Sequence, residues 1–512
     1  MPTRHPAVPP DADPPEDPAA SDPREAPAAA TFALELDLPP GRAGRLARHP
    51  AFAGRTGRAR GSAETLIWLD TAEGALAADG LALEAPARGD RRMIHGLDRG
   101  AEPGAPPRVA DIEAPPEPLV PIAAFDGRRM VWRLAGDVVA TLRHGRLRSV
   151  AAEAEAARLL LEGPPTAVLA LAHALAADLP LLPATVSLAE AARALAHNTA
   201  PRDRRRGAPV PTPDASLADA LAAAIGHLTD VLLIQAPRAH DGTAVEGVHQ
   251  MRVAARRLRS LLRVFRRAID GPPLRRLDAG LRDVAGRLGP ARDWDVFLGG
   301  IGAGLHEAAG TDKRVAALLR RAAAERDTAY TALRATLDGA DWRHLTLDLV
   351  AAARLPDWRT EVADPTILDA PLPPFAAEVL ARRWRGLKRA ARDIETLSMT
   401  ELHALRLDAK RVRYAAELLA PLWPERATKR FAKRLAALQE ALGLANDATV
   451  ARDLAMRLST TAKGASKAVS PWAIGLLEGY ALARAAGARE HAIAAWEDAR
   501  SAPIYWKNPP IQ

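Results

Sequence analysis

Apolar residues follow two different periods in the two halves of this chain. In the first 200 residues they alternate with polar or small residues in short runs, beginning with Phe32, Leu34, Leu36 and Leu38. Such alternation is typical of a half-buried strand, and similar runs predict strands at 65–69, 93–97, 130–135, 138–142 and 147–151. Helical spacing occurs at about 164–178 and 187–197. Residues 31–200 are therefore predicted to form an α+β domain with an antiparallel sheet.

Beyond residue 215 the apolar positions recur every three to four residues nearly to the end of the chain. This period predicts helices at 216–236, 247–269, 274–288, 313–336, 375–397, 400–420 and 427–458. Proline lies between these runs, at 237, 272–273, 356, 371–374, 421 and 424, where helices are expected to stop. Residues 215–505 are thus predicted to be an all-α domain. The Pro- and Arg-rich segment 201–214 is the expected linker between the two domains.

The helical half contains an internal repeat with an offset of 154 residues. HQMRVAARRLRSLL from His249 matches HALRLDAKRVRYAA from His403, and LRDVAGRLGPARDWDV from Leu281 matches LAALQEALGLANDATV from Leu435. Two matches in the same register over nearly 50 residues indicate two tandem helical subdomains, at about 215–360 and 370–505.

Each copy of the repeat carries a stripe of basic residues on one helix face. At 100° per residue, the first stripe falls within an arc of about 80° and comprises His249, Arg252, Arg256, Arg259 and Arg263. The second comprises His403, Arg406, Lys410 and Arg413, and a third helix offers Arg382, Arg385, Arg389 and Arg392. A solvated charged face is the simple alternative. Such faces usually interleave Glu with the cations, however, and like charges four residues apart destabilise a helix. The stripes therefore favour a polyanionic partner.

The charge distribution points the same way. The 512 residues include 62 acidic and 70 basic residues, of which only 8 are Lys. Residues 1–200 carry 21 basic and 26 acidic residues, a net −5, and residues 201–512 carry 49 and 36, a net +13. A positive field confined to the helical half suggests a polyanion there. The Arg excess alone says less, because a GC-rich genome also enriches arginine codons.

Several classes of protein are disfavoured by the composition. The chain has no cysteine, which excludes thiol catalysis, thiolate metal sites and disulfides. Residues 1–30 are rich in Pro, Ala and acidic residues, which predicts a disordered tail without the apolar stretch of a secretory signal. The chain has no run of 18 apolar residues, so no membrane span is predicted. We therefore expect a cytoplasmic protein with no membrane partner; the oligomeric state is left open.

The two stripes resemble the conserved histidine α-helical domain family, CHAD. Its pattern, His-x-x-Arg-hydrophobic-x-x-(Arg/Lys)-Arg-hydrophobic-Arg, is matched at His249–Arg259 and again at His403–Arg413, and a Leu-Gly-x-x-(Arg/Asn)-Asp motif follows each copy. The resemblance covers about 215–505. It implies two four-helix bundles related by pseudo-two-fold symmetry, a basic central surface, binding of inorganic polyphosphate, and a location on polyphosphate granules.

The resemblance also implies a set of polyphosphate-binding residues. Together with Arg292 of the later motif, these are His249, Arg252, Arg256, Arg257, Arg259, Arg263, Arg292, His403, Arg406, Lys410, Arg411 and Arg413. Arg forks can chelate phosphate oxygens bidentately, so the residue types suit this ligand. No catalytic residue, metal ligand or cofactor is expected in this domain.

Residues 31–200 resemble a CYTH-type triphosphate tunnel domain whose motifs have degenerated. The Glu-x-Glu-x-Lys positions read Ala33, Glu35 and Asp37, and two expected cations are replaced by Glu84 and Asp98. A triphosphatase needs cations for the phosphates and carboxylates for Mg²⁺ or Mn²⁺. Because the cations at these positions are missing, we expect an inactive tunnel-like barrel, and Mg²⁺ or Mn²⁺ only if the domain is active.

Two alternatives to a non-catalytic polyphosphate-binding protein remain. The first is a metal-dependent tripolyphosphatase or related phosphohydrolase acting through residues 31–200. The second is a general binder of polyanions or nucleic acid. The stripes lack the interleaved aromatic residues that stack on bases, since Tyr414 is the only aromatic next to either, and this favours polyphosphate over nucleic acid.

Overall fold

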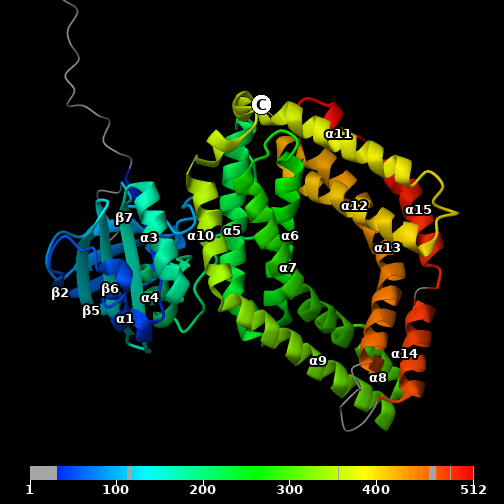
Figure 1. Ribbon diagram of the computed structural model, residues 1–512, viewed down its shortest axis with the longest axis horizontal. Coiled ribbons are helices and arrows are strands. Elements are labelled where there is room, and N and C mark those ends of the chain that lie inside the picture. The colour runs from blue at the N-terminus through cyan, green and yellow to red at the C-terminus, as the bar shows by residue number, and fades with distance from the viewer. Residues whose placement is uncertain (1–30, 112–117, 356, 461–468, 485, 511–512) are drawn as a thin grey trace, which may run out of the picture.

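The chain forms an antiparallel sheet unit followed by a larger helical unit (Figure 1). The computed structural model describes residues 31–111, 118–355, 357–460, 469–484 and 486–510. The tail expected at 1–30 lies outside these residues.

The sheet unit contains eight strands in the order β4-β3-β2-β5-β6-β7-β1-β8, with antiparallel pairing between neighbours. Their bounds are β1 Phe32–Asp37, β2 Arg60–Asp70, β3 Leu81–Pro86, β4 Arg92–His95, β5 Val120–Leu134, β6 Val138–Ser149, β7 Glu153–Gly163 and β8 Leu182–Pro183. The antiparallel sheet expected from the sequence is confirmed. The separate strands expected at 138–142 and 147–151 are wrong, because a single long strand, β6, spans both.

Helices pack on the sheet through small and aliphatic residues. The helices of this unit are α1 Ala43–Leu46, α2 Ala75–Ala78, α3 Pro165–Asp178 and α4 Leu188–Ala196. The apolar residues of α3, among them Val168 and Leu175, join a core with Leu34, Trp132 and Leu159 from the strands. Apolar residues of α4 form a second core with Phe125 and other apolar residues of the strands.

The helical unit begins with α5 and surrounds a central space (Figure 1). Its helices are α5 Leu217–Asp241, α6 Val245–Phe265, α7 Pro272–Gly299, α8 Ile301–Ala309, α9 Lys313–Leu337, α10 Ala340–Arg354, α11 Leu372–Ala390, α12 Met399–Leu419, α13 Glu425–Thr460, α14 Pro471–Arg484 and α15 Ala488–Arg500. Pro237 lies inside α5 and Pro290 inside α7, so the expectation that Pro237 ends a helix is wrong. The helix continues to Gly242, whose left-handed conformation caps it.

Both copies of the repeat contribute to two apolar cores in this unit. The larger core includes residues from α5, α6 and α7 of the first copy and from α11, α12, α13 and α15 of the second. A smaller core joins Trp294 and Phe297 of α7 with Leu454 of α13 and Leu477 of α14. Among the described residues of the helical unit, six helices, α5 to α10, precede residue 355, and five, α11 to α15, follow residue 370. Two bundles of four helices and a pseudo-two-fold axis therefore remain predictions.

Two contacts fix the position of α6, the helix with the first basic stripe. Gly247 lies so close to α5 that a Cβ there would be 2.6 Å from the carbonyl carbon of Arg238. Val248, Met251, Ala255, Leu258 and Leu262 are buried, which leaves the adjacent arc of the helix, about 100° further round, to the basic stripe. One helix, α5, is apolar and long enough to cross a bilayer, but 78% of its most apolar window is buried within the fold.

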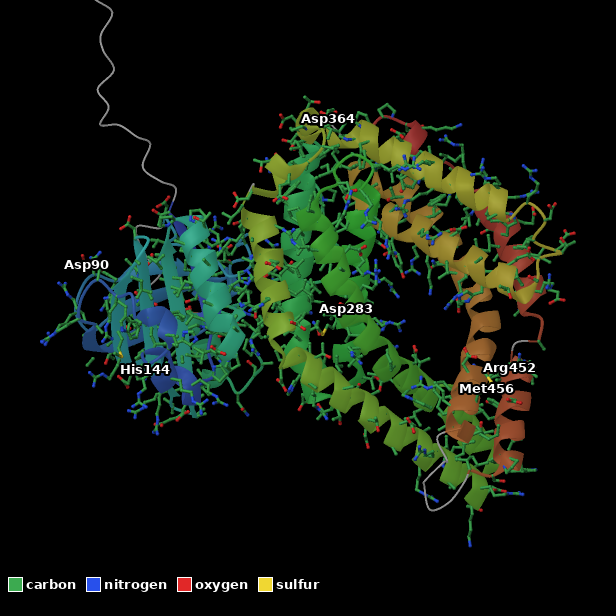
Figure 2. All side chains as sticks on the ribbon, viewed as in Figure 1. Asp90, His144, Asp283, Asp364, Arg452 and Met456 are labelled. Carbon is green, nitrogen blue, oxygen red and sulfur yellow. The ribbon has the colours of Figure 1, made fainter. Side chains whose placement is uncertain are left out.

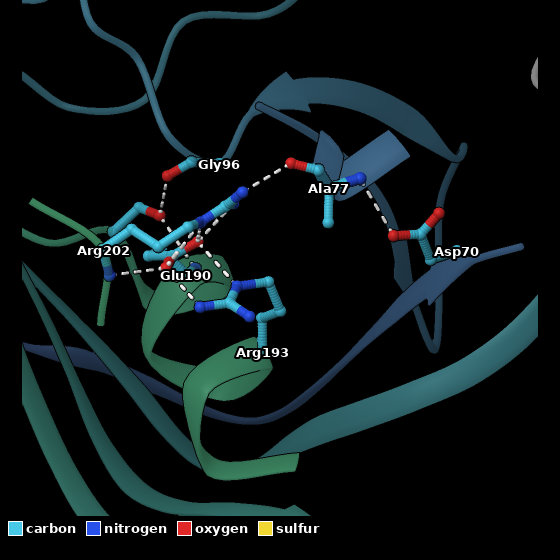
Figure 3. Close-up of polar contacts among 7 residues, drawn as sticks. Asp70, Ala77, Gly96, Glu190, Arg193 and Arg202 are labelled. Atoms are coloured by element: carbon cyan, nitrogen blue, oxygen red, sulfur yellow. Dashed lines mark hydrogen bonds and ion pairs between the residues drawn. The ribbon is translucent and has the colours of Figure 1, made fainter. Parts of the chain in front are cut away.

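The segment expected to be a linker is bound to both units. Arg202 donates to Glu190, a carboxylate only 2% exposed on α4, and to the carbonyl of Ala77 (Figure 3). Arg193 binds the same carboxylate (Figure 3). On the helical side, Arg204 binds Asp230, which is completely buried on α5. The arginines of the connection at 201–206 thus bind it to both units.

Candidate functional site

A cavity of about 580 Å³ lies between α6 and α7 of the first copy of the repeat and α12, α13 and α14 of the second. Side chains that end in nitrogen atoms surround the central space of the helical unit (Figure 2). Arg452 and Met456 on α13 lie across this space from α6 and α7. The lining of the cavity includes the apolar residues Phe297, Ile301 and Leu454. We call it the central cavity.

The charged lining of the central cavity is almost entirely cationic. It contains two histidines, six residues with a permanent positive charge and one carboxylate: His249, His403, Arg252, Arg256, Arg292, Arg406, Lys410, Arg484 and Asp293. The carboxylate of Asp293 lies 3.5 Å from a guanidinium nitrogen of Arg252. A net charge of about +5 in one cavity, with both copies contributing, makes this a site for a multivalent anion.

Arg256 is a half-buried cation of the lining. Its guanidinium lies over the ring of Tyr414 from α12, 4.7 Å from the ring centroid. Burial, with the neighbouring arginines, lowers the pKa of Arg256 below its usual range, yet the group remains charged at neutral pH. The Nε–H is buried and has no hydrogen-bond acceptor. An unsatisfied charged donor of this kind is what an incoming phosphate oxygen could satisfy.

His249 is electrostatically coupled to the same cations. Burial, followed by the positive charge of Arg292, lowers the pKa of His249 below its ordinary value. The imidazole is therefore neutral at pH 7 and can donate one hydrogen bond to an anion. A bound polyanion would offset the field of the arginines and raise this pKa.

The structure brings seven of the twelve predicted site residues into the central cavity and places the other five elsewhere. The seven are His249, Arg252, Arg256, Arg292, His403, Arg406 and Lys410. Arg263 and Arg411 line a second pocket, next to α11. Their assignment to a ligand remains a prediction, because no ligand is present.

Three predicted site residues have structural partners instead. Arg259 donates to Asp278, which is 2% exposed on α7, at 3.0 Å. Arg257 lies 3.5 Å from Glu417, and Arg413 binds the same Glu417 and Gln439. These contacts join α6 to α7, α6 to α12 and α12 to α13. The helical arc alone could not separate these three from their neighbours, because the carboxylates come from other turns and helices.

Arg484 lines the central cavity but was not predicted from the sequence. It lies at the end of α14, outside both copies of the motif. No spacing signal marks it, since only the packing of α14 against α8, α9 and α13 brings it to the cavity.

In the sheet unit the carboxylates of the CYTH-like positions are close to arginines. Glu84 accepts from Trp68 and Arg92, and Asp98 accepts from Arg108. Asp37 pairs with Arg158. Among the residues described, no three His, Asp or Glu side chains gather to hold a metal ion.

Glu35, on β1, is also buried, with 7% of its surface exposed. Burial raises its pKa, while the charges of Arg158, Arg143 and Arg204 act in the opposite direction. The family pattern does not mark these arginines, because they lie on β6, β7 and the connection to α5.

Comparisons with known proteins agree with the helical architecture. A family model for the CHAD domain matches residues 223–456. The crystal structure of the CHAD domain from the plant Ricinus communis is 26% identical, covers 60% of this chain and 98% of its own, and superposes with a TM-score of 0.51. PptA from Streptomyces chartreusis is 21% identical and covers 55% of this chain and 100% of its own, with a TM-score of 0.44.

No curated protein sequence matches the chain significantly. The CHAD match lies wholly within the helical unit and includes the lining of the central cavity up to α13. Residues 223–456 of the helical unit therefore match the CHAD domain.

Proposed function

We propose that this protein binds inorganic polyphosphate in the central cavity and performs no chemistry on it there. The observation that supports the proposal is the charge of the lining, which has six permanent cations and a single carboxylate. Both copies of the repeat contribute cations to it. Polyphosphate carries about one negative charge per phosphate and has no bases to be recognised. A cavity of about 580 Å³ has the volume of roughly 20 waters, enough for several phosphate groups.

The distribution of aromatic side chains favours polyphosphate over nucleic acid. Proteins that bind single-stranded nucleic acid stack bases on aromatic rings as well as neutralising the backbone. Phe297 is the only aromatic residue in the described lining of the central cavity, and Tyr414 lies against Arg256. The ligand is therefore expected to be recognised through its phosphates alone.

Hydrolysis by the sheet unit is not part of this proposal. Glu84, Asp98 and Asp37 stand where the resemblance expects cations for the phosphates, and each of these carboxylates is bound by an arginine. A phosphate-release assay with either metal checks this, and release that is lost in Glu35→Gln would contradict it.

The test is direct binding of long-chain polyphosphate to the full chain across a salt series. Up to six phosphate contacts predict a slope of log K against log [salt] approaching about −4, taking ~0.7 per contact as for a flexible single strand. The variant Arg252→Glu/Arg406→Glu should lose most of the affinity and flatten the slope. The control Arg320→Glu/Arg430→Glu changes the charge equally on exposed helix positions outside the cavity.

Equal losses in the two variants would show that net charge, and not the cavity, binds the anion. Granule association belongs to the same proposal. It predicts that a fluorescent fusion follows polyphosphate granules in cells and disperses when Arg252→Glu/Arg406→Glu is introduced.

A further inference from the structure

A second cavity, of about 450 Å³, lies between α6, α11 and α12. It is separated from the central cavity by α12 itself. Lys410 lines the central cavity and the next residue, Arg411, lines the second one, about 100° further around the helix. We call it the α11 pocket. The third basic stripe of the sequence contributes Arg389 to its lining.

Four arginines and one carboxylate give the α11 pocket its charge. The arginines are Arg263, Arg383, Arg389 and Arg411, and the carboxylate of Asp408 pairs with Arg411. Arg383 donates to the carbonyl of Arg411 at 2.9 Å, and no ion pair joins Arg263, Arg383 or Arg389 to a carboxylate among the described residues. The pocket therefore retains about three uncompensated positive charges.

The mutual repulsion of these arginines affects their pKa values. Burial, together with the charges of Arg382, Arg411 and Arg263, lowers the pKa of Arg383 to about 10. Burial and nearby Arg259 also lower the pKa of Arg263. Both groups stay protonated at pH 7, so the repulsion persists in the folded protein unless an anion offsets it.

The internal repeat relates the residues on the two sides of the α6–α12 contact, and the charges at the corresponding positions differ. The 154-residue offset relates Arg257 to Arg411 and Glu417 to Arg263. On one side Arg257 and Glu417 form an ion pair at 3.5 Å. On the other side the corresponding positions are both arginines. One side of the contact is thus neutral and the other is cationic, although both derive from one sequence pattern.

We propose that the α11 pocket is a second anion site, which binds an inorganic condensed phosphate of two or more phosphoryl groups. Its volume equals that of about 15 waters, and its guanidinium groups can bind phosphate oxygens bidentately. Leu387, Ala390 and Val412 form an apolar wall beside them. The proposal does not depend on the proposed function, because the two cavities have no lining residue in common.

The test is calorimetric titration of the full chain with tripolyphosphate at low salt. The wild type should bind at two sites. Arg263→Glu places a carboxylate opposite Arg411, as Glu417 stands opposite Arg257, so this variant should keep its melting temperature and bind at one site only. Arg389→Gln should weaken the second site about tenfold. Lys388→Glu, an exposed position on the same helix outside the pocket, should leave both sites intact.

Each alternative outcome contradicts the proposal. Two unchanged sites in Arg263→Glu, or an equal loss in Lys388→Glu, would show that the α11 pocket is not the second site. Binding of ATP to this pocket more than tenfold tighter than tripolyphosphate would overturn the inorganic assignment. Failure of the proposed function would appear separately, as unchanged polyphosphate binding in Arg252→Glu/Arg406→Glu.

Discussion

Removal of Arg204 should destabilise the protein although this residue lies in a segment without regular structure. Its Nε donates to Asp230 at 3.0 Å, and both side chains are nearly inaccessible, with exposures of 8% and 0%. Removing one partner of a buried ion pair costs about 3–5 kcal/mol, because it leaves the other charge uncompensated. Arg205, 3.4 Å from the same carboxylate, reduces the loss, so we expect about 3 kcal/mol for Arg204→Met.

The assay is urea unfolding followed by circular dichroism at 222 nm. The control is Arg206→Met, whose side chain is 77% exposed and pairs only with Asp203. A surface pair of that kind contributes about 0–1 kcal/mol. The double variant Arg204→Met/Asp230→Leu should recover most of the lost stability, since it leaves no buried charge.

The pH dependence provides a second signature. Burial raises the pKa of Asp230, and Arg204 acts against this rise. Without Arg204 the pKa should rise further, so the variant's deficit is smallest at acid pH and grows as the pH rises through the folded pKa. A loss below about 1 kcal/mol in Arg204→Met, or a double variant less stable than the single one, would refute the reasoning.

Three further predictions concern single side chains. Polyphosphate affinity should increase as the pH falls from 7 to 5.5, because a bound anion offsets Arg292 and raises the lowered pKa of His249; His249→Asn should reduce this dependence in a titration series. Tyr414→Leu should weaken polyphosphate binding about threefold to tenfold by removing the ring beneath Arg256, and unchanged affinity in the same assay would contradict this role. Glu35 has a raised pKa, so its contribution to stability is present at low pH and is lost as the pH rises through that pKa; Glu35→Gln should remove this dependence in thermal melts between pH 5 and 8, and parallel curves for the two proteins would contradict it.

The sequence predicted what depends on local periodicity. The alternation of Phe32, Leu34 and Leu36 identified β1, and the 154-residue repeat identified α6 and α12 as related helices with basic faces. It failed where distant residues decide. Pro237 remains inside α5 because tertiary packing holds the last turn, and no local signal distinguishes it from a helix-ending proline.

The same limit applies to the candidate site. Arg259 and Arg256 belong to one stripe, but Asp278 of α7 binds the first and Tyr414 of α12 lies beneath the second. Only the positions of the neighbouring helices assign them different surroundings. Arg484 carries no motif at all and reaches the central cavity solely through the packing of α14.

Helix α10 belongs to both units of the chain. Its residues Leu347 and Val350 pack in the core of the sheet unit, and Leu345 and Leu349 pack in the core of the helical unit. Arg343 also donates from α10 to the carbonyl of Ala176 at 2.6 Å.

A helix shared in this way couples the unfolding of the two units. Neither unit can lose its core without exposing one face of α10, so the two should melt in one cooperative transition. A helical half produced alone would present those apolar side chains to solvent, where they favour self-association. The two units that the sequence separates are therefore expected to fold together, and the sheet unit covers an apolar face of α10.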